Sequence, residues 1–217
     1  MRMRWFAGTV FILGIGLILY PFVQDLYGER QQHQLLDRLE AEGVEDVSLE
    51  GDMAGRYDAL NAVLDEGAIT ESTTRNASVA DQALLGKISI PSIELELPIV
   101  NGATEDNLKY AVGRLSGTGM IGEDGNTALA AHRGYSHGEL FNRLDEVQTG
   151  DDISINAGRI SYKYTVRDTF LVLPTNLSVL DDVEDTSVIT LITCDPGQDP
   201  THRLIVRAEL IEKKDNS

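Results

Sequence analysis

The sequence predicts a mainly β domain, built as a closed barrel or a sandwich, that follows an apolar segment and a helical stem. From residue 84 on, β-branched residues recur in short runs between Gly, Pro and Asn, as they do in strands. Only one helical pattern interrupts these runs. Many short strands with few helices indicate a barrel or a sandwich.

Eight segments show the strand pattern, and one segment among them shows a helical pattern. Residues 138–147 are expected to form a short helix, because four apolar side chains fall on one face. These side chains belong to Leu140, Phe141, Leu144 and Val147. The expected strands are residues 86–90, 95–100, 110–115, 127–132, 152–156, 161–173, 188–194 and 203–211.

Residues 5–23 are apolar along nearly their whole length. A helix of about 20 such residues crosses the hydrocarbon core of a bilayer. Arg2 and Arg4 precede the segment, whereas Asp25 and Glu29 follow it. This asymmetry predicts a single-pass signal anchor, with a cytoplasmic tail at residues 1–4 and the remainder outside the cell. A cleaved signal peptide is the alternative, but no Ala-x-Ala-like cleavage site follows the apolar run.

A helical stem and linker is expected between this anchor and the barrel, over residues 24–83. Apolar residues recur there at three- and four-residue spacing, and Gly43 and Gly51 divide the pattern into two short helices. Residues 69–78 are rich in Ser and Thr, which predicts a loop. Two roles are open for this loop: a simple linker, or a lid that folds over the functional site.

The composition excludes some classes of function. The chain has 35 acidic and 18 basic residues and a formal net charge of −17. Because a cationic surface is needed to meet phosphates, this balance argues against a general nucleic-acid-binding protein. The chain has neither an HExxH motif nor a second cysteine, so the usual zinc ligands are missing. We therefore predict no metal and no other cofactor.

Cys194 is the single cysteine among 217 residues, and it closes the strand-like run of residues 190–194. A disulfide within the chain is therefore impossible, which leaves an inert buried thiol, an intermolecular link or a nucleophile. A lone cysteine is often a small buried hydrophobic residue. Outside the cell, where paired cysteines oxidise, an unpaired one also fits a reactive thiol.

A cysteine nucleophile needs a general acid and base, and histidine suits this role because its pKa lies near neutral. His132 is the favoured candidate, since it ends a strand of small residues just before a Gly-containing turn. His33 lies in the stem and His137 in the following loop. His202 is expected on the strand face opposite to Arg203, because side chains alternate along a strand.

A fixed guanidinium can stabilise the oxyanion that forms during acyl transfer. Arg203 and Arg207 share one face of the last strand, and Arg203 is nearer the turn that follows Cys194. Nine positions separate Cys194 from Arg203, which suits two adjacent strands of a hairpin. Taken alone, an arginine on a terminal strand is more often an exposed partner in a salt bridge.

Three segments together resemble the sortase family, the membrane-anchored cysteine transpeptidases of Gram-positive cell surfaces. Residues 190–194 (TLITC) match the TLxTC signature of that family. Residues 201–207 (THRLIVR) match the strand with its arginine, and residues 131–134 (AHRG) match the segment with its histidine. The resemblance implies an eight-stranded catalytic β-barrel over residues 84–211, with residues 212–217 as a C-terminal tail.

The resemblance also implies roles for single residues. Cys194 is expected to be the nucleophile, His132 the acid and base, and Arg203 the group that orients the substrate or stabilises the oxyanion. Thr193, next to the nucleophile in the signature, is assigned to substrate binding. The implied partners are secreted proteins with an LPxTG-like sorting motif, which the enzyme joins to an amine through a thioester.

Within the family, residues 132–134 and 139–144 look most like class C, the pilin-polymerising sortases. The acceptor amine is then a pilin lysine. Two departures stand against this class: residues 24–84 contain no Asp-Pro-aromatic lid motif, and the last residues are polar rather than a second membrane span. Two alternatives stay open: a housekeeping or class D-like sortase that anchors surface proteins to peptidoglycan, and a non-catalytic tethered binding module.

Overall fold

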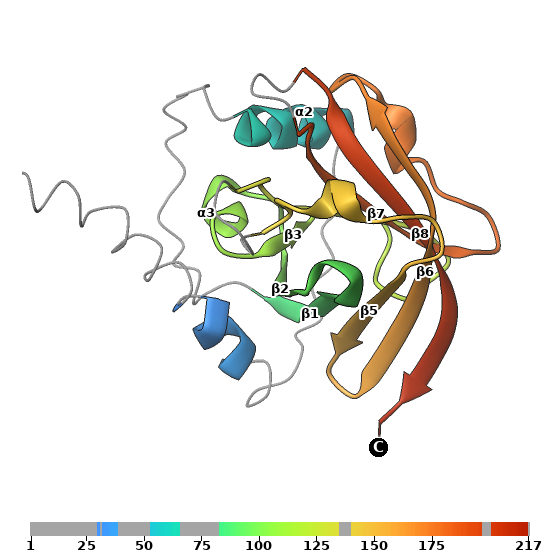
Figure 1. Cartoon of the computed structure of the whole chain (residues 1–217). Coiled ribbons are helices and arrows are strands. Elements are labelled where there is room, and N and C mark those ends of the chain that lie inside the picture. Colours follow the sequence, from blue (N-terminus) through green and yellow to red (C-terminus); the bar gives the residue numbers. More distant parts are fainter. Residues whose placement is uncertain are drawn as a thin grey trace, which may run out of the picture.

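The computed structural model describes residue 30 and residues 32–38, 53–65, 83–134, 140–196 and 201–216. Eight strands form a closed barrel in the order β1-β2-β3-β4-β7-β8-β6-β5 (Figure 1). This architecture confirms the predicted eight-stranded barrel. The strands are β1 (Leu84–Ile90), β2 (Leu95–Asn101), β3 (Val112–Arg114), β4 (Gly125–Ala130), β5 (Asp152–Ala157), β6 (Ile160–Val172), β7 (Ser187–Cys194) and β8 (Arg203–Asp215).

The helical elements are short and lie around the barrel (Figure 1). In the described residues they comprise the helical residues 32–38, α2 (Met53–Leu64), α3 (Glu105–Leu108) and the 3-10 turns η2 (Pro91–Ile93), η3 (Leu144–Glu146) and η4 (Leu177–Leu180). The largest buried cluster contains inward-facing residues of all the long strands, such as Ile88, Ile155 and Leu191. A second buried cluster lies on the outer face of β4, β7 and β8, where α2 and η4 pack.

The helix predicted over residues 138–147 is wrong for the described part of this segment. Residues 140–143 form a turn and only the three residues of η3 are helical. Leu140 has φ +43°, a left-handed backbone conformation that interrupts an α-helix. The four apolar side chains of this segment are nevertheless all buried. The turns place them in the main core of the barrel, and they are Leu140, Phe141, Leu144 and Val147.

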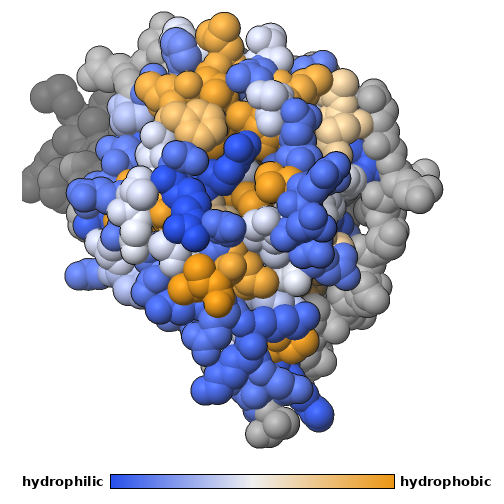
Figure 2. Space-filling view, turned by 90° about the vertical axis from the view of Figure 1, so that its right-hand side faces the viewer, coloured by the Kyte–Doolittle hydropathy of each residue, from blue (hydrophilic) through white to orange (hydrophobic). Residues whose placement is uncertain are grey.

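The predicted C-terminal tail is also corrected in part, since β8 continues to Asp215 and pairs there with Ile160 of β6. Residues 212–215 are therefore strand rather than tail, and Lys213 lies over the ring of Tyr162 at 5.5 Å. Figure 2 shows the outer face of β6 and β8 as largely polar, with apolar groups in separate places. The large hydrophobic side chains exposed in the described chain are Leu171, Leu173, Leu177 and Ile211.

The expected stem contains two described helical segments, and both pack on the barrel. Leu35, from the helical residues 32–38, is buried with Leu84, Val100 and Ala111. Helix α2 lies at the opposite end of the molecule, beside the start of β8 at the top of the view (Figure 1). The predicted membrane anchor and the loop of residues 69–78 fall outside the described residues. Within the described ranges, no helix has the length and apolar character needed to cross a bilayer.

The side chain of Asn126 connects three elements, which are β4, η4 and β7. Its side-chain amide donates to the carbonyls of Val179 and Asp181 at 2.9 and 3.1 Å, and its oxygen accepts from the hydroxyl of Thr190 at 2.8 Å. The side chain is fully buried. This hydrogen-bonded group ties η4 to the paired strands β4 and β7.

We expect Asn126→Ala to lower the free energy of unfolding by about 2–3 kcal/mol, because it leaves buried polar partners without hydrogen bonds. For a chain of this size the melting temperature falls by roughly 4–12 °C, which calorimetry or circular dichroism measures. Asn156→Ala is the control, since Asn156 is exposed and bonds only Ser161 at the surface. Equal melting temperatures for the two variants would contradict this role of Asn126.

Candidate active site

The pairing of β7 with β8 places Cys194 and Arg203 side by side. Cys194 is the last residue of β7, Arg203 is the first of β8, and the two are direct partners in the antiparallel register. Both side chains fall on the outer face of the barrel, because Ile192, Cys194 and Ile205 share the outer cluster. The spacing of nine residues predicted this hairpin contact, and the structure confirms it.

His132 is brought to the same level by β4, the other neighbour of β7. The parallel register pairs Ala130 with Ile192, and the amide of Ala131 donates to the Ile192 carbonyl at 3.2 Å. Continued two residues past the end of β4, this register would bring His132 beside Cys194. Ala128 and Ala130 belong to the outer cluster, so the alternation of the strand directs the half-buried His132 to the same face.

Cys194 is covered by α2. The thiol is only 6% exposed, and it donates a hydrogen bond to the main-chain carbonyl of Leu64 at 3.1 Å. Leu64 is the last residue of α2, where carbonyl groups lack partners within the helix. The thiol thus meets one of the unpaired acceptors of the helix end.

Arg203 is fully buried, and its guanidinium is also held by this end of α2. Nε donates to Asn61 Oδ1 at 2.8 Å, and Nη2 donates to the Asn61 carbonyl at 3.2 Å. Nη2 also pairs with the Asp65 carboxylate at 2.7 Å. These contacts stabilise the buried charge of Arg203, whose burial without partners would cost free energy. They also occupy the N–H donors that an oxyanion or a peptide carbonyl would use.

The apolar face of α2 fills the surface between these groups. Tyr57, Leu60 and Leu64 are fully buried in the outer cluster with Cys194 and Ile205. Each such side chain contributes about 1.5–3 kcal/mol through its burial. Burial raises the pKa of Tyr57, while the positive charge of Arg203 acts in the opposite direction, in keeping with a phenol close to the guanidinium.

Thr193 occupies a different position from the other predicted residues. It precedes Cys194 on β7, so its side chain lies on the opposite face, toward the interior of the barrel. It is fully buried, and its hydroxyl has no hydrogen-bond partner in the described part of the chain. Its assignment to substrate binding therefore stays a prediction.

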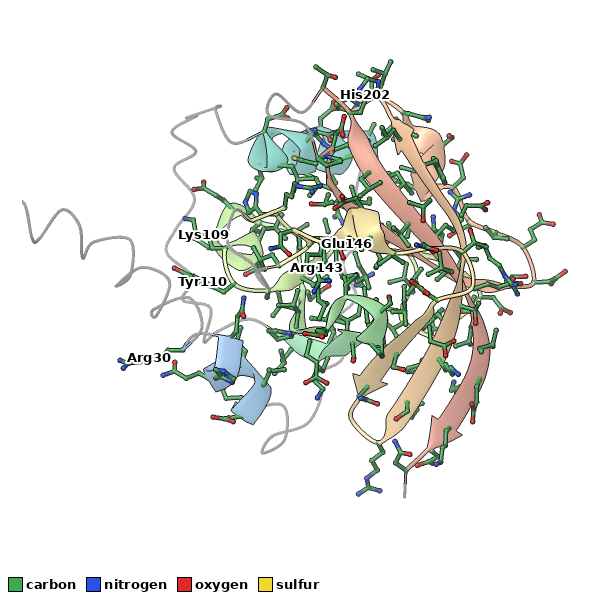
Figure 3. The ribbon with its side chains drawn as sticks, viewed as in Figure 1. Arg30, Lys109, Tyr110, Arg143, Glu146 and His202 are labelled. Carbon is green, nitrogen blue, oxygen red and sulfur yellow. The ribbon has the colours of Figure 1, made fainter. Side chains whose placement is uncertain are left out.

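The other histidines are placed away from this constellation or lie outside the description. His33 is exposed on the helical residues 32–38. His202 points away from the barrel at the start of β8 (Figure 3), where its ring contacts the Thr201 hydroxyl at 2.8 Å. His137 lies outside the described residues. His132 is thus the described histidine that the strand register brings to Cys194.

The residues of α2 that cover this site were not predicted from the sequence. The spacing of apolar residues over 24–83 predicted helices there, but as part of a stem. An apolar helical face has to be buried somewhere, and this was the available signal. Asn61 and Asp65 carried no signal of their own, since their partner Arg203 is more than 130 residues away. Within the described ranges, no group of His, Cys, Asp and Glu side chains is arranged to hold a metal ion.

Comparison with known proteins supports the same class of enzyme. The Sortase domain family model matches residues 88–211. Sortase A of Bacillus anthracis is 30% identical over 208 residues, which cover 96% of this chain and 94% of that protein. The structure of sortase A from Listeria monocytogenes matches with a TM-score of 0.57 and 30% identity, over 62% of this chain and 91% of that one. Sortase C-3 from Streptococcus pneumoniae matches with a TM-score of 0.59 and 26% identity, over 76% of this chain and 84% of that one.

The chain therefore belongs to the sortase family. It is an enzyme, a cysteine transpeptidase, rather than the non-catalytic tethered module that the sequence left open. The relatives include members of classes A and C, so membership of the family does not by itself decide the class.

We expect Arg203→Lys to lower kcat/KM for transfer of a sorting-motif peptide by about 100- to 1,000-fold. Lysine keeps the charge but loses the planar fork of donors, and loss of one oxyanion donor costs this much in other acyl transfers. Arg207→Lys is the matched control, because Arg207 lies four residues further along β8 on the same face, over the Phe170 ring at 5.8 Å. A loss in Arg207→Lys as large as that in Arg203→Lys would contradict the assignment.

Proposed function

We propose that this sortase cleaves an LPxTG-like sorting motif and transfers the acyl fragment to an amine through a thioester on Cys194. The single observation that supports the proposal is the strand register, in which Cys194 pairs with Arg203 and the end of β4, two residues before His132, pairs with Ile192. A nucleophile, a proton carrier and a fixed cation are the groups that acyl transfer requires.

In the first step, the sulfur of Cys194 attacks the carbonyl carbon between Thr and Gly of the motif. Arg203 donates hydrogen bonds to the developing oxyanion or to the backbone of the motif. His132 takes the proton of the Cys194 thiol as the sulfur attacks, and it gives a proton to the nitrogen of the departing glycine as the C–N bond breaks. The products are a thioester on Cys194 and a free glycine amine on the released fragment.

In the second step, an acceptor amine attacks the thioester. His132 removes a proton from that amine, an amide bond forms, and the thiol of Cys194 is restored. Dividing one difficult acyl exchange into two easier steps is the benefit of covalent catalysis.

The proposed acceptor is the side-chain amine of a pilin lysine, so that the product is a covalent pilus. The class C resemblance of residues 132–134 and the similarity to sortase C-3 support this acceptor. The amine of a cell-wall precursor peptide is the second candidate. The similarity to sortase A along nearly the whole chain favours it.

We further propose that residues 5–23 anchor the enzyme in the cell membrane and that the barrel lies outside, at a Gram-positive cell surface. The length of the apolar run and the basic residues before it support this placement. An external barrel meets its exported substrates on the same side of the membrane. Thiol chemistry is possible there because the chain has no second cysteine with which Cys194 could pair.

We expect Cys194→Ala to abolish transfer of a sorting-motif peptide. Mass spectrometry of the wild-type protein, acid-quenched early in the reaction, is expected to detect an adduct equal to the motif fragment that ends in Thr. The adduct should be absent from Cys194→Ala and should disappear from the wild type when hydroxylamine is added. Retained transfer by Cys194→Ala would show that the nucleophile lies elsewhere.

The acceptor is tested by offering a lysine-containing pilin peptide and a cell-wall stem peptide in equal amounts. Mass spectrometry of the products then gives the ratio of the two amides. We expect the pilin amide to predominate. A predominance of the stem-peptide amide would assign the enzyme to surface-protein anchoring instead.

A further inference from the structure

We propose that Asp145 is a positioning residue for His132: through its ion pair with Arg133, it holds the imidazole where protons pass between Cys194 and the peptide. The inference deepens the proposed function, because it rests on the role of His132 as the proton carrier. Asp145 acts in this account through Arg133, and it does not take part in the chemistry itself.

His132 lies beyond the part of β4 that strand pairing holds in place. The pairing of β4 with β7 ends at Ala130, and the amide of Ala131 adds one more hydrogen bond, to the Ile192 carbonyl at 3.2 Å. A proton carrier has to stay within hydrogen-bond reach of the groups between which it moves protons. Contacts other than the strand ladder must therefore fix His132.

Two such contacts come from residues 140–147. The amide of Phe141 donates to the His132 carbonyl at 3.1 Å. Nη2 of Arg133, the next residue in the chain, donates to Asp145 Oδ1 at 2.9 Å. The side chains of this pair are 24% and 37% exposed, so the pair is screened less by solvent than a fully exposed one. The first contact is between main-chain groups, whereas the second depends on the identity of both side chains.

The turn that contains Asp145 is fixed to the barrel. Leu144 and Val147, on either side of it, are buried in the main core. Arg143 Nη1 donates to the Ile93 carbonyl at 3.0 Å, which ties the turn to η2. The carboxylate therefore stands on an anchored segment and can hold its arginine partner in one place.

The pair also determines which way His132 faces. Side chains alternate along an extended chain, and Ala131 lies in the main core, so Arg133 is directed to that side and His132 to the other. η3 packs on the main core as well, so Asp145 receives Arg133 from the same side. Holding Arg133 at η3 therefore keeps His132 turned toward the outer face, where Cys194 lies.

The test measures kcat and KM of the full chain for transfer of a sorting-motif peptide. Asp145→Asn removes the charge but keeps the size of the side chain, and Arg133→Gln removes its partner. Glu146→Gln is the matched control, because it removes a carboxylate from the same turn. Glu146 pairs with Arg143 at 2.8 Å, within the segment, and not with the chain beside His132 (Figure 3).

We expect Asp145→Asn to lower kcat by about 10- to 100-fold, because misplacing a reacting group by about 1 Å is enough for such a loss. KM should change by less than about twofold, since the groups that bind the peptide remain. Asp145→Glu should restore most of kcat, and Glu146→Gln should match the wild type. The double variant Arg133→Gln/Asp145→Asn should lose no more than either single variant, because each removes the same ion pair.

A second substrate separates the positioning of a proton carrier from general damage to the site. The amide nitrogen of the sorting motif needs a proton from His132 in order to leave, whereas a phenyl thioester of the same motif releases a stable thiolate. The acyl group is transferred to Cys194 in both reactions. The loss of rate in Asp145→Asn should therefore be at least about threefold smaller with the phenyl thioester than with the amide.

An unchanged kcat in Asp145→Asn, or losses that multiply in the double variant, would overturn the inference. An equal loss with the amide and the phenyl thioester would overturn it too, since Asp145 would then support the site only as a structural contact. Melting curves check that the variants are folded, and Arg133→Gln serves for the same comparison if Asp145→Asn is not. Failure of the proposed function is separate: transfer retained by His132→Ala would contradict the role of His132, whatever the result with Asp145→Asn.

Discussion

The position of β7 between two different neighbours is the constraint on which the site depends. β7 runs parallel to β4 and antiparallel to β8, so its end meets the end of β4 and the beginning of β8. A slip of one residue in either pairing would turn the side chains to the opposite face. The register therefore sets Cys194 directly beside Arg203 and brings the end of β4, two residues before His132, to the end of β7.

The same arrangement creates an apolar outer face that cannot be left uncovered without cost. Ala128 and Ala130 give β4 a shallow surface, and Ile192 and Ile205 flank the thiol. Helix α2 buries this face in the structure. Under the proposed function, a peptide substrate at Cys194 would have to bury the same hydrophobic surface that α2 buries.

Arg203 adds an electrostatic constraint to this competition. A fully buried guanidinium needs acceptors on all its sides, and Asn61, Asp65 and the His202 carbonyl supply them. A substrate must bring carbonyl oxygens, and finally an oxyanion, to replace these acceptors. Because charge-assisted hydrogen bonds strengthen as negative charge develops, the exchange favours the transition state over the ground state.

The sequence by itself determined much of the barrel and the identity of the candidate triad. Period-2 alternation and turn residues located all eight strands, because a strand with one face in the core has to alternate. The apolar positions of residues 140–147 were also evident, but their helix was not formed, since Leu140 adopts a left-handed backbone. The lone cysteine and the nine-residue spacing indicated the hairpin contact, and the family signature pointed to His132.

Only the tertiary structure decided what α2 does. Its apolar face predicted burial, but a helical pattern does not say which surface receives it. Cys194 and Arg203, which contact Leu64, Asn61 and Asp65, lie 130 or more residues further along the chain and meet them only after the barrel has closed. The periodicity of apolar residues shows which side chains share one face of a helix or strand. A contact between a thiol and a carbonyl far away in the sequence forms only when the chain topology brings the two together.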